Sequence, residues 1–457
     1  MAKVLYVHAK GGPPVGYALP RVAARAEVHL LALSELPADS AARTHAWCAS
    51  RVAAEATGAD DLVASIVSRA REVGADAVVT FSEYAVVAVA EAARLLGLRG
   101  AGPAAALARD KRLMRTVWDR RGIPQPHFRP VATLEQLRRA TVELRSPLLL
   151  KAAWSAGSTA HQIISAPADA PAAWARSRAV MTESARLGYA ELHVAGAGED
   201  FIVEEIVTGC AEEWFEGTGW GDYVSVEGVV AQGVFRPVCV SGRMPTVAPF
   251  TERAGITPAA VTGEAQAAIV ALARRAVDAL GLEDCGTHTE IKLGTGGRMW
   301  VIETAARFGG AMTVPQIEEV FGIDLVGLFT DQLLGGAPDW PAAALTPADA
   351  RGAAGSLVVL AVDGSGAPWP SRHLWDSATV VRSAPVGPHS RLRVVEESSL
   401  PDGTPVPVYD PAAGANTMAA LCLLSADQPQ AVVRDFTALV DALAHLLPRH
   451  ATEGARA

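Results

Sequence analysis

The sequence predicts a mixed α/β and α+β fold that begins with a parallel sheet and ends in a smaller α+β unit. Residues 1–104 alternate strand and helix patterns, which is typical of parallel βαβ units. Residues 222–305 hold strand-like runs, and the chain after about residue 335 holds short strands followed by one long helix. Half of the 457 residues are apolar, so a large core can form, and this length predicts about three domains.

The composition argues against several partners and compartments. The formal net charge is −9 and no block of five like charges occurs, which argues against nucleic acid or an anionic membrane as partner. The five cysteines are scattered and never spaced as C-x-x-C, so we expect a reducing compartment without disulfides or zinc. The start, MAKVLYVHAKGG, lacks signal-peptide features, and no apolar run reaches the roughly 18 residues of a membrane span. We therefore expect a cytoplasmic protein.

The N-terminal segment supplies two predicted strands and two predicted helices. The strands are KVLYVHA (3–9) and DAVVTFS (76–82), and helical periodicity marks residues 62–75 and 84–97. Glycine and proline in GLRGAGP (97–103) indicate a boundary after this segment.

The middle of the chain begins with a charged helix at 105–122. Its basic cluster of Arg109, Lys111, Arg112 and Arg115 is compatible with a solvated helix face. The other predicted elements are a helix at 133–144, a strand at 147–153, a small-residue loop at 154–160, a strand at 200–209, two antiparallel strands within 222–242 and a helix at 264–282.

A hairpin with charged residues follows, in THTEIKLGTGGRMWVIET. If Leu293 pairs with Arg298, then His288 lies opposite Glu303, and His288, Glu290 and Glu303 share one face. The two carboxylates would then be diagonal neighbours about 7–8 Å apart at the backbone. A slip of one residue would separate them, so the prediction depends on this register.

Two carboxylates on a half-buried face require neutralisation, and Mg²⁺ commonly takes one or two carboxylates together with phosphate oxygens. Glu290 and Glu303 are therefore candidate metal ligands. Arg307, four residues past Glu303, could stabilise charge that develops on a phosphoryl or acyl oxygen. The alternative is a solvated edge hairpin whose charges pair with Lys292 and Arg307.

Anion-binding features precede the hairpin in the sequence. Lys151 ends an apolar strand, where a buried ammonium needs a partner such as phosphate, although it could also extend to solvent. Lys111 lies in ARDKRLM, and the loop 155–159 is small enough for its backbone N–H groups to cradle phosphate. Glu204 and Glu205 end another apolar run, which could be a hinge that contacts adenine or an ordinary exposed edge.

The order of these motifs, from Lys111 to Arg307, resembles that of the ATP-grasp superfamily. Within it, GDYVSVEGVV, CGTHTEIKL and ETAARFGGAM resemble the L-amino acid ligase branch. The resemblance implies an ATP-grasp fold, ATP and Mg²⁺ (or Mn²⁺) as cofactors, and small-molecule substrates. It also implies an N-terminal domain at 1–104, a small lobe with linker helices at 105–199, a large lobe with the metal hairpin at 200–334 and a C-terminal α+β domain at 335–457.

The resemblance also implies roles for single residues. The expected nucleotide-binding residues are Lys111, Lys151, Ser155 and Arg243 at the phosphates, Glu204, Glu205 and Val207 at the adenine hinge, and Asp222 at the ribose, with Glu212 or Glu213 as alternatives. The expected metal ligands are Glu290 and Glu303. The expected catalytic residue is Arg307, at the acyl phosphate. His288 is a second catalytic candidate because of the face it shares with the carboxylates, and it either relays a proton from the amine or makes a structural hydrogen bond to Glu303. The expected substrate-facing residues are Glu83, Ser158, Gly310 and Ala311.

Two positions depart from the common ATP-grasp pattern. Thr304 and Ala305 follow Glu303, where many of these enzymes read Glu-x-Asn. The ligase branch also carries Ala there, so the two glutamates would bind the metal without an Asn. Ala311 is small where a bulky residue would narrow a pocket, which predicts a roomy site for the amine.

The implied function is an ATP-dependent carboxylate–amine ligase that forms an acyl phosphate and then an amide or dipeptide, with release of ADP and phosphate. Two alternatives are another ATP-grasp reaction, such as carboxylation or a purine-type ligation, and a non-catalytic nucleotide-binding subunit. The branch also implies a homodimer.

Overall fold

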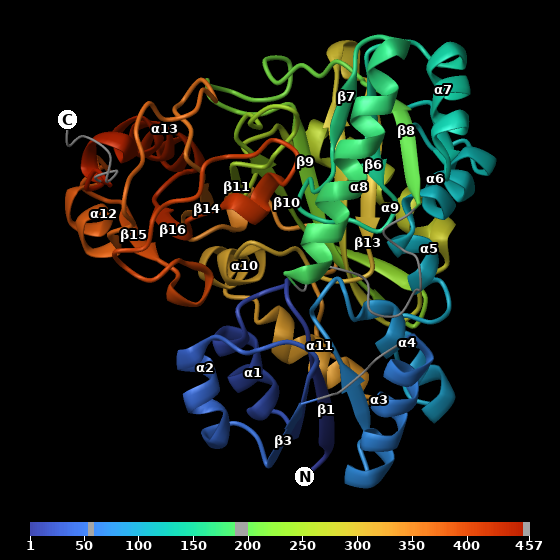
Figure 1. Cartoon of the computed structure of the whole chain (residues 1–457). Helices are drawn as coiled ribbons and strands as arrows, with labels where there is room; N and C mark the ends of the chain where they lie inside the picture. Colours follow the sequence, from blue (N-terminus) through green and yellow to red (C-terminus); the bar gives the residue numbers. More distant parts are fainter. Residues whose placement is uncertain (54–58, 188–199, 451–457) are drawn as a thin grey trace, which may run out of the picture.

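A computed structural model describes residues 1–53, 59–187 and 200–450, in which three β-sheets carry the helices on their faces (Figure 1). The strands are β1 (Lys3–His8), β2 (Glu27–Ala32), β3 (Ser50–Ala53), β4 (Ala77–Val79), β5 (Phe128–Val131), β6 (Leu148–Ala152), β7 (Gln162–Ile164), β8 (Phe201–Glu205), β9 (Tyr223–Ala231), β10 (Val234–Arg243), β11 (Ala254–Thr257), β12 (Cys285–Leu293), β13 (Met299–Ala305), β14 (Ala353–Val359), β15 (Arg391–Val394) and β16 (Ala420–Ala426).

The helices are α1 (Val15–Ala23), α2 (Ala38–Arg43), α3 (Ala59–Val73), α4 (Val86–Leu96), α5 (Ala105–Arg109), α6 (Lys111–Arg120), α7 (Leu134–Glu143), α8 (Ala170–Arg186), α9 (Gly263–Leu280), α10 (Thr313–Phe321), α11 (Leu325–Leu333), α12 (Ser377–Ser383) and α13 (Pro429–Leu446). Among these described helices, none is both long and apolar enough to cross a membrane.

The N-terminal sheet is parallel, in the order β3-β2-β1-β4, as the alternating pattern predicts. The middle of β1 and all of β4 are apolar on both faces because helices cover both, and Val4, Leu5 and Leu30 are fully buried, whereas the edge strand β3 is largely exposed. The chain reverses its direction of winding between β1 and β4. Ligands of open parallel sheets bind outside the carboxyl ends of the strands at such a point. The loops after β1 and β4 hold Lys10 and Glu83, and both line the cavity described below.

A four-stranded antiparallel sheet, β5-β8-β6-β7, forms the second layer, with α7 and α8 beside it (Figure 1). The central strand β6 carries Lys151, and its neighbour β8 carries Glu204. In the antiparallel register, Leu149 lies opposite Glu204 and Lys151 opposite Ile202. Both predicted strands of this region are confirmed.

The third sheet is antiparallel and runs in the order β13-β12-β9-β10-β11-β14-β16-β15. It includes the predicted pair within 222–242, which forms β9 and β10, and the predicted metal hairpin, which forms β12 and β13. The strands after residue 335 continue this same sheet through the pairing of β11 with β14. The domain boundaries at 104, 199 and 334 stay predictions.

The predicted helix at 105–122 is broken in two. Asp110 has extended backbone angles (φ −89°, ψ 108°) and its carboxylate accepts a hydrogen bond from the Arg112 backbone N–H at 2.8 Å, so it caps α6. Lys111 therefore begins a helix, and its backbone N–H donates to the Ala153 carbonyl at the end of β6. The alternative of a solvated helix face is wrong, because Arg109, Lys111 and Arg115 are buried.

Candidate active site

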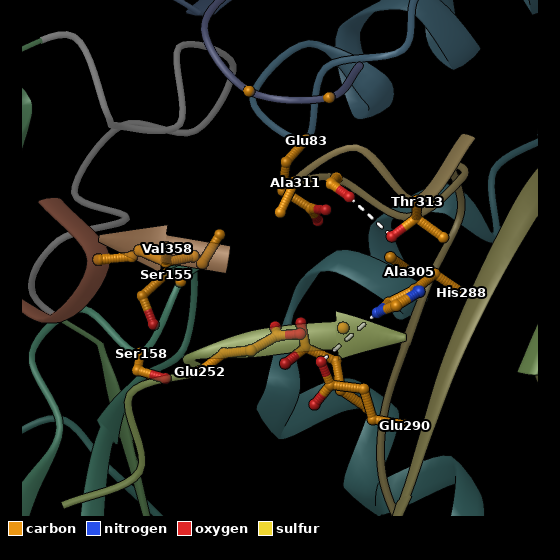
Figure 2. A pocket seen from close by; sticks show the side chains of 18 of the residues that line it. Glu83, Ser155, Ser158, Glu252, His288, Glu290, Ala305, Ala311, Thr313 and Val358 are labelled. Atoms are coloured by element: carbon orange, nitrogen blue, oxygen red, sulfur yellow. Dashed lines mark hydrogen bonds and ion pairs between the residues drawn. The ribbon is translucent and has the colours of Figure 1, made fainter. Parts of the chain in front are cut away.

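A cavity of about 680 Å³ lies where the three sheets meet, and Figure 2 shows part of its wall. That volume is within the range of small-molecule sites. His288 and Glu290 lie on one side of the view, Ser155 and Ser158 on another, and Glu83 and Ala311 on a third. The predicted site residues that line the cavity are Glu83, Lys111, Lys151, Ser155, Ser158, Glu204, Glu205, Val207, Arg243, His288, Glu290, Glu303, Arg307, Gly310 and Ala311.

The hairpin places Glu290 directly opposite Glu303, in a register that differs from the predicted one. Leu293 pairs with Met299 rather than Arg298, and a bulge follows in which Ile302 is the extra residue on β13. The bulge shifts the pairing beyond it by one residue. The predicted register was therefore wrong, and the carboxylates are closer in the ladder than expected.

His288 lies opposite Ala305, and the predicted hydrogen bond to Glu303 is also wrong. Its Nδ1 lies 2.6 Å from Glu227 Oε1, and its Nε2 lies 3.5 Å from Glu290 Oε1. Burial would lower the pKa of His288, but the carboxylates of Glu227 and Glu290 together outweigh it and raise the pKa to about 9. In the imidazolium form the ring has no lone pair to accept a proton from an amine. The predicted relay would require His288 to lose that proton first.

The carboxylate pair is suited to a hard cation. The side chains of Glu290 and Glu303 are 26% and 24% exposed at the cavity wall, and Lys111 Nζ lies 3.2 Å from Glu303 Oε1. Burial raises the pKa of Glu290, but His288 and Arg243 hold it below its usual range, so this carboxylate is ionised. A pair of carboxylate ligands fits Mg²⁺, which keeps phosphate and water in its other positions.

No cluster of three or more His, Cys, Asp and Glu side chains is arranged around a metal position in residues 1–53, 59–187 and 200–450. The alternative, a solvated hairpin whose carboxylates pair with Lys292 and Arg307, is wrong because both of these cations pair with other residues. Lys292 pairs with Asp222 at 2.6 Å, and Arg307 pairs with Glu83.

Arg307 is held by a buried carboxylate. Its Nε contacts Glu83 Oε2, and Arg109 Nε lies 3.4 Å from the other oxygen of Glu83. Burial would raise the pKa of Glu83, but Arg307 and Arg109 outweigh it and hold the pKa below its usual range. Arg109 also donates to the carbonyls of Trp154 at 2.7 Å and Ser155 at 3.3 Å. The buried Arg109 guanidinium thus connects Glu83, the partner of Arg307, to the small-residue loop.

The inward end of β8 carries a second buried ionic cluster. Glu204 contacts Lys151 Nζ through one oxygen and lies 2.8 Å from Arg115 Nη2 through the other. Lys151 is only 6% exposed, so the alternative that it extends to solvent is wrong. Glu205 points the other way and pairs with Arg145, whose side chain is 83% exposed. Glu204 therefore faces inward, and the alternative of an ordinary exposed edge is wrong for this residue.

Arg243 and Asp222 differ in their relation to the cavity. Arg243 is buried, pairs with Glu252 at 2.5 Å and donates to Ser225 Oγ at 2.8 Å. Asp222 does not line the cavity, although its ion-pair partner Lys292 does. The alternatives Glu212 and Glu213 are exposed. A ribose contact from any of these acids stays a prediction.

Sequence reasoning missed several charged and polar residues around the motifs: the buried Arg109, Arg115, His161 and Glu227, and the half-buried Glu252. Arg115 could have been found from its spacing with Lys111, because it is four residues further along the same helix and so lies on the same face. Arg109 lies on α5, before the break at Asp110, and this spacing does not reach it. Glu227 carries no local signal, because its partner His288 lies 61 residues away on another strand.

The sequence of this chain is similar to that of a known protein family and of known ligases. Residues 144–315 match the family described as "ATP-grasp domain". The chain contains an ATP-grasp domain. Over 275 residues the chain is 38% identical to alanine–anticapsin ligases of Bacillus amyloliquefaciens and Bacillus subtilis. The match covers 60% of this chain and 57% of those relatives, so it spans little more than half of their length.

Solved structures share the ATP-grasp fold along nearly the whole chain. An L-amino acid ligase from Bacillus licheniformis superposes with a TM-score of 0.69 and 18% identity, over 99% of both chains. A biotin carboxylase from Campylobacter jejuni has a TM-score of 0.65 and 17% identity, over 98% of this chain and 92% of that one. Identities this low show the fold and not the reaction. The mixed fold with an N-terminal parallel sheet is thereby confirmed as an ATP-grasp fold.

Proposed function

We propose that this protein is an ATP-dependent carboxylate–amine ligase. It joins an amino acid or similar carboxylate to an amino acid or amine through an acyl phosphate, and it releases an amide or dipeptide, ADP and phosphate. The observation that carries the proposal is the convergence of the paired Glu290 and Glu303, the two lysines Lys111 and Lys151, and Arg307 on one cavity. The ligase names of the 38% identical relatives favour amide formation over carboxylation.

The nucleotide would lie along the wall formed by β6 and β8. The hinge residues Glu204, Glu205 and Val207 line the cavity at the end of β8. Lys111 and Lys151 are buried cations at its inner wall, where phosphate would compete for them with their present carboxylate partners. Such charge-assisted contacts are stronger than neutral hydrogen bonds.

Glu290 and Glu303 would hold Mg²⁺. When bound, the ion supplies positive charge that neutralises the phosphate oxygens. Arg307, oriented by Glu83, would stabilise negative charge on the acyl phosphate and on the tetrahedral species that follows amine attack. Its orientation is set before substrate binds, because the Glu83 contact is buried.

The amine side of the cavity would lie at Gly310 and Ala311. Ala311 has a left-handed backbone (φ 47°) and lines the cavity together with Val358 (Figure 2). The absence of side-chain atoms beyond Cβ at Ala311 leaves room for a substrate side chain, and Ser158 lines the same cavity.

The chain would act as a cytoplasmic homodimer. All five cysteines, Cys48, Cys210, Cys239, Cys285 and Cys422, are free thiols, which suits a reducing compartment. Size-exclusion chromatography with light scattering would test the dimer, and a monomer would contradict it.

Phosphate release with a panel of paired amino acids tests the reaction. We expect release only when ATP, Mg²⁺ and both substrates are present, with the amide identified by mass spectrometry. Release that depends on bicarbonate would instead indicate carboxylation. ATP binding without turnover on any pair would indicate a non-catalytic nucleotide-binding subunit.

A further inference from the structure

His161 is a buried histidine that lines the cavity and belongs to none of the motifs described above. It is 9% exposed and immediately precedes β7. The β6–β7 ladder ends with Leu150 opposite Gln162, and one further step in this register would place His161 opposite Lys151. Both residues line the cavity. Residues directly opposite each other on antiparallel strands share a face. His161 therefore extends from the same wall as the lysine expected at the phosphates.

The backbone immediately before His161 is anchored by two hydrogen bonds, both at Ala160. Ala160 is fully buried with a left-handed φ of 64°, and its N–H donates to the Ala412 carbonyl at 2.8 Å. The Ala160 carbonyl accepts a hydrogen bond from Ser177 Oγ at 3.0 Å. The ring is thus presented from a rigid turn, which lowers the entropic cost of ordering a ligand contact.

The two ring nitrogens of His161 differ in their surroundings. Nδ1 is buried and has no hydrogen-bond partner among the described residues. A proton on Nδ1 would leave a buried donor without an acceptor, close to the ammonium groups of Lys151 and Lys111. The lone pair belongs on Nδ1, which places the proton of the neutral ring on Nε2.

The charge of the ring is set by the same neighbours. Burial, followed by Lys151 and Lys111, lowers the pKa of His161 well below its usual value. A neutral imidazole in this position is a hydrogen-bond donor that adds no further positive charge to the wall. Its natural complement is an anion that the two lysines also attract.

We propose that His161 binds the phosphate chain of the nucleotide by donating a hydrogen bond from its Nε2–H. The proposal rests on the proposed ATP-dependent function, and it assigns to this residue a direct contact with ligand beside Lys111 and Lys151.

Three substitutions distinguish a ligand contact through Nε2 from one through Nδ1. His161→Gln places an amide N–H near the position of Nε2, His161→Asn places one near Nδ1, and His161→Ala removes both. Affinities for adenosine, ADP and a non-hydrolysable ATP analogue are measured by calorimetry with Mg²⁺. A hydrogen bond to a charged phosphate predicts that Ala and Asn weaken ADP and analogue binding by about 10- to 100-fold. Adenosine affinity stays within about twofold, and Gln retains most of the phosphate affinity.

A matched control is His29→Gln. His29 is similarly buried but bonds to Ser50 and Glu27 away from the cavity, so its replacement is expected to leave nucleotide affinity unchanged. If the Ala variant does not fold, the comparison of Gln with Asn decides the question.

The outcomes distinguish the two proposals. Equal loss of adenosine and ADP affinity, or unchanged affinity for all three ligands, would overturn the assignment of His161 while leaving the ligase intact. Retained phosphate affinity in Asn and loss in Gln would overturn the assignment of Nε2. Failure of the unmodified protein to bind any adenine nucleotide would contradict the proposed function itself.

Discussion

Replacing Glu204 with Gln removes a buried charge that two cations share. The Glu204 carboxylate contacts Lys151 through one oxygen and Arg115 through the other, and the three side chains are 5%, 7% and 3% exposed. The variant therefore leaves two buried cations without their anion. We expect a large loss of stability in the four-stranded sheet.

The magnitude follows from the geometry. At an effective dielectric constant of about 20, unit charges about 3 Å apart attract each other by about 5–6 kcal/mol. The side-chain carbonyl of the introduced glutamine would still accept one hydrogen bond, which recovers part of this loss. Breaking a buried ion pair by removing one partner typically costs about 3–5 kcal/mol, and we expect the Glu204→Gln change to fall in that range.

The assay is urea denaturation followed by tryptophan fluorescence. Trp174 packs on Phe201 of β8 with ring centroids 4.9 Å apart, so it reports on unfolding beside this sheet. Glu205→Gln is the matched control, because its partner Arg145 is solvent-exposed and the pair is worth less than about 1 kcal/mol. A Glu204→Gln loss below about 1 kcal/mol, or equal to that of Glu205→Gln, would refute the reasoning.

The contacts of Glu204 with Lys151 and Arg115 also predict that the stability of the protein depends on pH. Burial raises the pKa of Glu204, but Lys151 and Arg115 outweigh it and hold the pKa below its usual range. The stabilisation is therefore present above the unfolded-state pKa of about 4.3 and is lost as the pH falls through the lower folded-state value. The stability gap between the unmodified protein and Glu204→Gln should narrow as the pH drops below about 4.3. A gap that widens in acid would contradict the sign.

Four further substitutions test the site. Glu303→Gln removes one of two expected metal ligands and should abolish Mg²⁺-dependent phosphate release, so retained release would contradict the metal assignment. Ala311→Trp should narrow the range of amine substrates in a product assay. Ala311→Asn, which tolerates the left-handed backbone, should narrow it less; an unchanged range for Trp would contradict the roomy pocket. Arg109→Gln removes one of two cations from Glu83 and should misplace Arg307, lowering kcat by about 10- to 100-fold. An unchanged kcat would show that Arg109 does not position Arg307.

Local patterns predicted much of the fold and most members of the site. Strand alternation and helical periodicity located β6, β8, β9, β10 and α9, because these patterns depend only on neighbours a few residues away. They failed at Asp110, where a single capping side chain divides a helix that the periodicity predicts to be continuous. They also missed β16, whose pairing with β14 depends on a partner far along the chain.

The order of Lys111, Lys151, Glu290, Glu303 and Arg307 was decided by the sequence alone, and it suffices to indicate the ATP-grasp domain. Which side chains meet was decided only by the tertiary structure. A bulge of one residue brings the two glutamates directly opposite each other, and no local periodicity reveals an inserted residue.

The ion-pair partners of His288 and Arg307 were likewise decided only by the tertiary structure. Glu227 reaches His288 from β9, and Glu83 reaches Arg307 from the loop after β4. These contacts span 61 and 224 residues of sequence (288 minus 227 and 307 minus 83). Periodicity reports which face a residue occupies, whereas ion-pair geometry depends on how separate sheets pack together. The sequence therefore determined which chemical groups are present and the order in which they occur, and packing determined which of them can act together.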